Sequence, residues 1–99
     1  MIYIVWRFVT RPDRVADFEA HYGADGSWAQ LFRRHSGFRG TELLPELDQP
    51  GSYLLWDKWD ALASFDAFKR EHAADYAALD RECEALTLKE EKVGIFQLP

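Results

Sequence analysis

The sequence lacks the features that mark secreted, membrane-spanning and nucleic-acid-binding proteins. It has one cysteine, Cys83, which excludes an internal disulfide and is compatible with a reducing compartment. No apolar run reaches the length of about 18 residues that a membrane span needs, and we expect no signal peptide before the folded sequence. The 12 basic residues are outnumbered by 17 acids, a formal net charge of −5, which argues against binding to nucleic-acid phosphates. We therefore expect a cytoplasmic protein that binds neither nucleic acid nor membranes.

Nucleotide-binding motifs and repeats are also absent, since there is neither a G-x-G-x-x-G fingerprint nor a P-loop. Without repeats, low-complexity segments or linkers, a single domain over residues 1–99 is expected. Bulky apolar side chains are abundant: the chain is 47% hydrophobic and has 7 Phe, 4 Tyr and 4 Trp. A small monomer cannot easily bury so much apolar surface, which predicts a homo-oligomer.

Four segments have the composition of β-strands, at residues 1–9, 38–44, 53–59 and 91–98. In the first and third, both alternating faces are largely apolar, so both sides of the sheet are expected to be covered. A turn-rich segment at 45–52 joins the second strand to the third.

Helices are predicted between these strands. Asp13 is the expected N-cap of a first helix, and Ser27 with Gln30 forms an S-x-x-Q capping box that restarts the helix after a glycine-containing break. Asp60 is the expected cap of a single long helix, whose apolar stripe has steps of three or four residues: Phe65, Phe68, His72, Tyr76, Leu79, Cys83 and Leu86.

The predicted order is strand, interrupted helix, strand, strand, helix, strand. It indicates an α+β, ferredoxin-like four-stranded antiparallel sheet with helices on one face. The apolar face without helices then needs a partner. The same sheet of a second copy would supply it and form a dimeric α+β barrel.

Three segments resemble the antibiotic biosynthesis monooxygenase (ABM-type) domain family: the opening strand with Pro12, SGFRGTELL at Ser36–Leu44, and YLLWDKWDALASFDAF at Tyr53–Phe68. The resemblance covers nearly the whole chain, and two further segments are similar to one uncharacterised subgroup. It implies a homodimeric monooxygenase that oxidises a small aromatic or polyketide-like substrate with O2 and without a cofactor. Two other hypotheses stay open: a non-catalytic dimeric module that binds an aromatic metabolite or haem, and a purely structural dimer.

The resemblance also implies a ligand cleft between the sheet and the second long helix, lined by Trp6, Phe68, His72 and Tyr76. At this spacing Phe68 and Tyr76 are more often ordinary core residues, because a helix stripe must pack on its own sheet. His72 is the candidate general base toward a phenol, or a half-buried histidine without a catalytic role. Arg7 is a candidate for binding a substrate oxygen, or else pairs with a carboxylate.

Haem degradation and metal binding are not favoured. The family's haem-degrading members have an asparagine on the first strand, where Trp6 stands here, and a helix histidine where this chain has Tyr76 to Ala78. His72 with Asp75 or Glu71 would supply two metal ligands, but no third is visible. Cys83 lies on the apolar stripe and is expected to be a small buried residue. We therefore expect neither a metal nor a cofactor.

Overall fold

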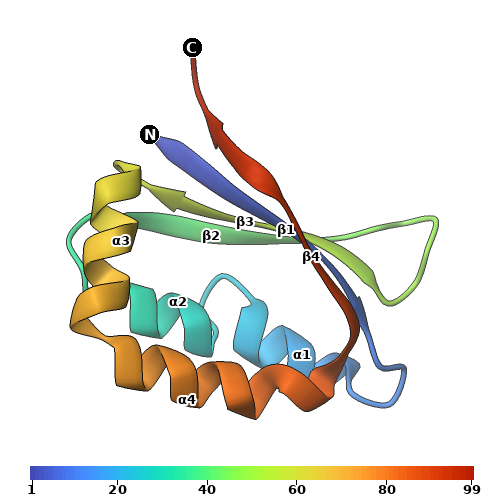
Figure 1. The fold of residues 1–99 in the computed structure, drawn as a ribbon. Coiled ribbons are helices and arrows are strands. Elements are labelled where there is room, and N and C mark those ends of the chain that lie inside the picture. The colour runs from blue at the N-terminus through green and yellow to red at the C-terminus, as the bar shows by residue number, and fades with distance from the viewer.

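The computed structural model describes residues 1–99, and its strands form one antiparallel sheet with the helices packed on one side (Figure 1). The four strands have the order β2-β3-β1-β4, which confirms the predicted ferredoxin-like arrangement. Along the chain the elements are β1 (Ile2–Thr10), α1 (Val15–Tyr22), α2 (Ser27–Phe32), β2 (Phe38–Pro45), β3 (Ser52–Trp59), α3 (Leu62–Glu71), α4 (Ala73–Cys83), a 3-10 turn η1 (Glu84–Leu86) and β4 (Thr87–Gln97). None of the helices combines the length and the apolar character that crossing a membrane requires.

The core lies between the central strands and the helices. Side chains of β1 and β3 alternate as predicted, so that Ile4, Phe8, Leu55 and Trp59, each at most 4% exposed, face the helices. Most of the core is aromatic and includes Phe8, Phe18, Tyr22, Trp28, Phe32, Trp59 and Phe68. Neighbouring rings in it lie 4.5 to 6.2 Å apart, within the range that favours aromatic packing.

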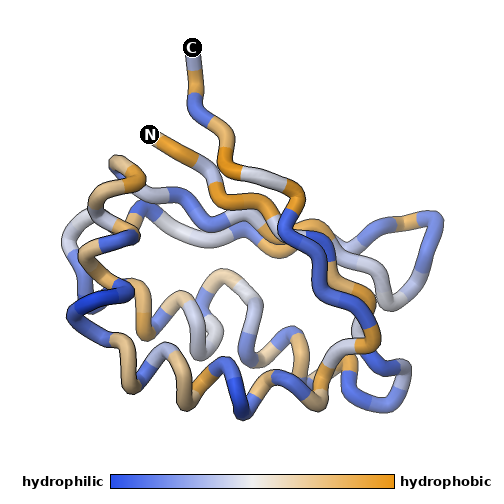
Figure 2. Tube along the Cα trace, in the orientation of Figure 1, coloured by the Kyte–Doolittle hydropathy of each residue, from blue (hydrophilic) through white to orange (hydrophobic).

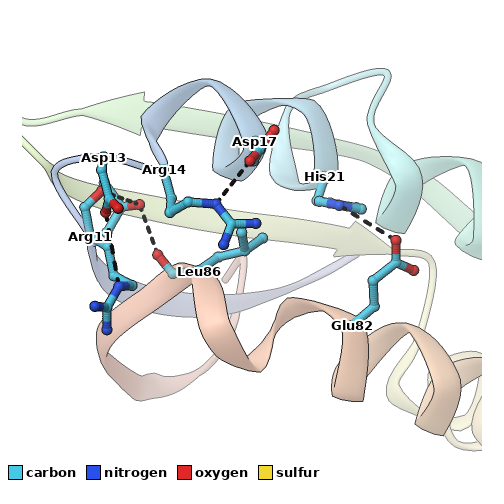
Figure 3. Close-up of polar contacts among 8 residues, drawn as sticks. Arg11, Asp13, Arg14, Asp17, His21, Glu82 and Leu86 are labelled. Atoms are coloured by element: carbon cyan, nitrogen blue, oxygen red, sulfur yellow. Dashed lines mark hydrogen bonds and ion pairs between the residues drawn. The ribbon is translucent and has the colours of Figure 1, made fainter.

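The first helix starts later than predicted. α1 begins at Val15 and its N-cap is Arg14, so the prediction that Asp13 caps it is wrong. The Asp13 carboxylate lies 3.9 Å from Nε of Arg11, and Nε of Arg14 donates a 2.9 Å hydrogen bond to Asp17 (Figure 3). This exposed i,i+3 pair stabilises the first turn by only about 0.3 kcal/mol.

The second helix also begins without the predicted capping box. Gly26 is the N-cap of α2 and Ser27 is already helical, and the Ser27 hydroxyl is hydrogen-bonded to Nδ1 of His21 at 2.9 Å. A Cβ atom at Gly26 would lie 2.6 Å from the His21 carbonyl oxygen, so only glycine permits this close approach of α1 and α2. Because only glycine fits at this position, the N-cap residue of α2 has no side chain with which to cap the helix.

The long helix predicted after Asp60 is two helices, α3 and α4, that run in clearly different directions (Figure 1). The break lies at His72, where φ is −121° and ψ is 31°. The N-cap of α3 is Ala61, so Asp60 does not have the predicted capping position. The local sequence contains no Gly or Pro at the break, and its apolar period continues across it, which is why the pattern predicted a single helix.

Contacts at the far end of α4 fix β4 against β1. The Arg11 amide donates to the Leu86 carbonyl at 2.9 Å, and the Thr10 hydroxyl donates to the same oxygen at 3.0 Å. Glu82 of α4 lies 3.9 Å from Nε2 of His21 on α1 (Figure 3). The two hydrogen bonds to Leu86 hold the start of β4 beside the end of β1, and the Glu82–His21 contact joins α4 to α1.

The other face of the sheet carries no helix (Figure 1). We call it the outer face, and its central apolar side chains are Tyr3, Val5, Leu54, Trp56, Val93 and Phe96. Indole Nε1 of Trp56 donates a 2.6 Å hydrogen bond to Glu42, which fixes the ring on this surface. β4 starts earlier than predicted, and Val93 and Phe96 on this edge strand are 46% and 50% exposed. Apolar segments of β1 and β4 lie near both chain ends (Figure 2).

Candidate functional site

A small cavity lies between the sheet and the helices, where α2, α3 and α4 approach β1 and β3. Its volume is about 40 Å³, which is room for a few water molecules. Nine of its twelve lining residues are hydrophobic, and the aromatic ones are Trp6, Phe8, Tyr22, Trp28, Phe32, Phe65 and Tyr76. The other three are the acids Asp57, Asp80 and Glu90, and no basic side chain lines the cavity.

Asp57 is the most unusual of these residues because it is a buried acid on a core-facing position of β3. It is 6% exposed, and the hydroxyl of Thr41, directly opposite on β2, donates a 2.6 Å hydrogen bond to its Oδ1. Burial raises the pKa of Asp57 to about 6, although the Thr41 hydrogen bond acts in the opposite direction. Asp57 is therefore a stronger base than an ordinary aspartate and is still mostly ionised at neutral pH.

The two other acids lie at the solvent-exposed rim of the cavity, Asp80 on α4 and Glu90 on β4. Burial and then the charge of Asp80 raise the pKa of Glu90. Tyr76 of α4 also lines the cavity, and its pKa is raised to about 12, first by burial and then by the charges of Asp80, Asp57 and Glu90. The electrostatic potential in the cavity is therefore negative.

Two of the predicted site residues, Trp6 and Tyr76, line the cavity. Phe68 does not, because it is fully buried between Phe32 and Trp59, whose ring centroids are 5.2 and 5.6 Å away. His72 is not among the lining residues either. Its ring is half-buried beside Phe68, at a centroid distance of 5.1 Å, where α3 ends and α4 begins.

Arg7 lies on the outer face of the sheet, away from the cavity. Its Nη1 forms a 2.8 Å ion pair with Glu46, which is the carboxylate pairing considered from the sequence. Arg7 and the cavity residues are therefore on opposite faces of the sheet. The substrate-binding role implied for Arg7 would have to be exercised at the outer face.

Asp57 was not predicted as a site residue, although one signal in the sequence pointed to it. The alternation of β3 places Asp57 on the same face as Leu55 and Trp59, and a carboxylate at such a position is rarely buried without a purpose. No such signal in the sequence marks Asp80 or Glu90 as a cavity residue, because both lie in charged, solvent-facing segments. No group of three or more His, Cys, Asp or Glu side chains is arranged to hold a metal ion.

The fold and the cavity together define a class: an α+β protein with a ferredoxin-like sheet and an aromatic, acid-bearing cavity beneath it. Residues 1–79 match the sequence family described as antibiotic biosynthesis monooxygenase, and the chain belongs to this family. Among curated proteins, none matches the chain by sequence.

Solved structures with the same fold are numerous. The chain is similar to the N63A mutant of SnoaB, a cofactor-independent oxygenase from Streptomyces nogalater, with 25% identity and a TM-score of 0.80 over 98% of this chain and 91% of that one. It is also similar to a candidate antibiotic biosynthesis monooxygenase from Bordetella bronchiseptica, with 24% identity and a TM-score of 0.75 over 99% and 96% of the two chains. Another candidate of this kind, from Nitrosomonas europaea, is 14% identical with a TM-score of 0.72 over 99% and 98%.

Proposed function

We propose that the protein is a cofactor-independent monooxygenase that oxidises a small hydroxylated aromatic or polyketide-like substrate with O2. The observation that carries this proposal is the aromatic cavity with a buried carboxylate, in a chain of the antibiotic biosynthesis monooxygenase family. The likeness to SnoaB, which is described as a cofactor-independent oxygenase, supports the same chemistry. The family and the cavity favour an enzyme over a purely structural dimer.

The reaction converts a hydroxyarene and O2 to a quinone and water. The hydroxyl proton leaves first, because the resulting anion gives up electrons to O2 more readily than the neutral phenol. A new C–O bond forms at a ring carbon, that carbon loses its hydrogen, and the second oxygen atom departs in water. The protein must hold the ring flat, keep bulk water away and receive the proton.

An aromatic substrate does not fit the cavity at about 40 Å³, so binding must enlarge it. The side chains available for this movement are Phe65, Tyr76 and Trp6, which line the cavity and are only partly buried. Lys69 lies over the rings of Phe65 and Tyr76, with Nζ 5.5 and 5.1 Å from their centroids. Movement of these two rings would open the cavity between α3 and α4, and would displace Lys69 with them.

The oxygen electrode tests this proposal. Wild-type protein is supplied with hydroxylated polycyclic aromatics, and the product is analysed by mass spectrometry after reaction under ¹⁸O2. We expect substrate-dependent oxygen uptake and one ¹⁸O atom in the product. Binding of the aromatic compound without any oxygen uptake would contradict a catalytic role and would leave a non-catalytic binding module for an aromatic metabolite or haem.

The protein is also proposed to be a homodimer that pairs through the outer face. Supporting this are the apolar centre of that face and the exposed Val93 and Phe96 of β4, since surfaces of this kind are rarely left open to water. Phe96→Lys should shift the sedimenting species from dimer to monomer. Leu47→Lys is the matched control, because Leu47 is 95% exposed in the loop between β2 and β3 and should leave the dimer intact. A wild-type protein that sediments as a monomer would overturn the pairing.

A further inference from the structure

The buried carboxyl group of Asp57 has no evident structural purpose. Thr41 is its only hydrogen-bond partner, and no Lys or Arg lies in the cavity wall to neutralise it. A buried charge without a counterion is costly, and a Leu or Val at this core-facing position of β3 would avoid the cost. Residues of this kind are concentrated at functional sites.

Tyr76 shows how the cavity affects a phenol. Its hydroxyl resists ionisation because Tyr76 is partly buried and because Asp80, Asp57 and Glu90 are close. A phenolic substrate bound beside Tyr76 would meet the same burial and the same charges. Loss of its proton to bulk water would add another negative charge to the cavity, which this environment opposes.

Proton transfer within the cavity avoids this cost, because its net charge does not change when a carboxylate becomes a neutral acid and a phenol becomes a phenolate. We infer that Asp57 is the catalytic base that accepts the hydroxyl proton, and that the substrate is a neutral hydroxylated aromatic compound rather than one bearing a carboxylate. The inference rests on the proposed function, because it assigns the proton-transfer step of that oxidation.

The other acids are less suited to this step. Asp80 and Glu90 lie at the exposed rim, where water competes for the proton, and His72 lies outside the cavity wall. The titratable groups that face Asp57 across the cavity are Tyr22 of α1, Tyr76 and Asp80 of α4, and Glu90 of β4. The parts of β1, α2 and α3 that line the cavity are apolar. No cation in the wall therefore competes with the substrate for Asp57.

The proton is returned at the end of the reaction. Asp57 first takes the hydroxyl proton, and the electron pair of the substrate anion forms the new C–O bond, which reduces O2 to a bound peroxide. Protonated Asp57 then gives its proton to the terminal peroxide oxygen. The O–O bond breaks, that oxygen leaves as hydroxide and combines with the ring proton to form water, and the carboxylate is restored.

The test compares wild-type protein and Asp57→Asn in oxygen uptake with a neutral hydroxylated polycyclic compound between pH 5 and 8. For the wild type, kcat/KM should rise with pH through a limb near 6, the pKa of Asp57 in the free protein. In Asp57→Asn we expect kcat to fall by at least about 100-fold, the usual contribution of a general base, with a smaller change in KM and no limb near pH 6. A carboxylate-bearing analogue of the compound should bind wild-type protein at least about 10-fold more weakly, by repulsion in the negative cavity.

Further variants separate the role of Asp57 from that of local charge. Thr41→Val removes the hydrogen bond that lowers the pKa of Asp57, so the limb should move to higher pH, and this measurement decides the matter even if Asp57→Asn does not fold. Asp80→Asn should keep the limb near pH 6. In NMR of ¹³C-labelled tyrosine, Asp57→Asn should lower the pKa of Tyr76, a result that requires no activity.

Two failures are distinguishable. If the wild type turns over and Asp57→Asn keeps kcat within threefold and the same pH profile, the role of Asp57 is refuted and the oxygenase proposal stands. If the wild type consumes no oxygen with any of the aromatic compounds, the proposed function fails and Asp57 has no reaction to serve.

Discussion

Replacing Asp57 by Asn should change the free energy of unfolding in a pH-dependent way. Compared with wild type, the variant should gain more stability at neutral pH than at acid pH. The pKa of Asp57 is about 6 in the folded protein and 3.8 is its ordinary value, so the folded state binds the proton more tightly than the unfolded chain. For such a group, stability is greatest at low pH and falls as the pH rises between these two values. At about 1.4 kcal/mol per pKa unit, full ionisation of Asp57 costs about 3 kcal/mol.

The pH dependence makes the prediction independent of other effects of the substitution. The asparagine amide also brings new hydrogen-bond donors into the cavity wall, but their effect on the free energy of unfolding is the same at every pH. We subtract the free energy of unfolding of wild type from that of Asp57→Asn. This difference should increase by about 2 kcal/mol, in favour of the variant, between pH 4 and pH 7.5. For a chain of this size that corresponds to roughly 8–16 °C in Tm.

Urea unfolding followed by tryptophan fluorescence measures this quantity, at one fixed protein concentration because association would also affect stability. Asp66→Asn, which changes an exposed carboxylate on α3, is the control and should show no such pH dependence. A difference between Asp57→Asn and wild type that is constant from pH 4 to 7.5 would refute the argument, because it would mean that folding does not change the affinity of Asp57 for its proton.

Two other outcomes follow from the packing. Gly37→Ala should destabilise the fold by at least about 1 kcal/mol in the same urea assay, because the new Cβ would lie 2.5 Å from Cβ of Ser64, and an unchanged midpoint would show that the loop before β2 moves freely. Burial raises the pKa of the Cys83 thiol, so iodoacetamide should modify the native protein at pH 7.5 far more slowly than the urea-unfolded chain, and equal rates would contradict its burial.

The sheet and its order could be predicted from the sequence because strand periodicity and turn residues are local signals. The division of the long helix could not, because the break at His72 has no Gly or Pro and the apolar period continues across it. The helix starts were also mispredicted. Asp13 and Ser27 have side chains that can cap a helix. In the folded chain, however, Asp13 lies near Arg11 and Ser27 is hydrogen-bonded to His21, and neither contact can be read from the sequence.

The candidate site was predicted only in part for a related reason. Trp6 and Tyr76 line the cavity, but helical periodicity treats Phe68, His72 and Tyr76 as equivalent members of one stripe. The bend at His72 and the packing of Phe68 against Trp59 distinguish them. Asp57 was overlooked because its importance depends on burial, and burial is a property of the assembled sheet and helices.

The distribution of the four tryptophans over the two sides of the sheet makes the protein its own spectroscopic reporter. Trp59 is fully buried, and its indole nitrogen has no hydrogen-bond partner, so its emission should be strongly blue-shifted. Trp6 and Trp28 line the cavity, and Trp56 lies on the outer face. A quencher or a ligand in the cavity would therefore change the signals of Trp6 and Trp28, whereas contact with a second copy would change that of Trp56. Single-tryptophan variants would allow the two events to be followed separately in one solution, without any added label.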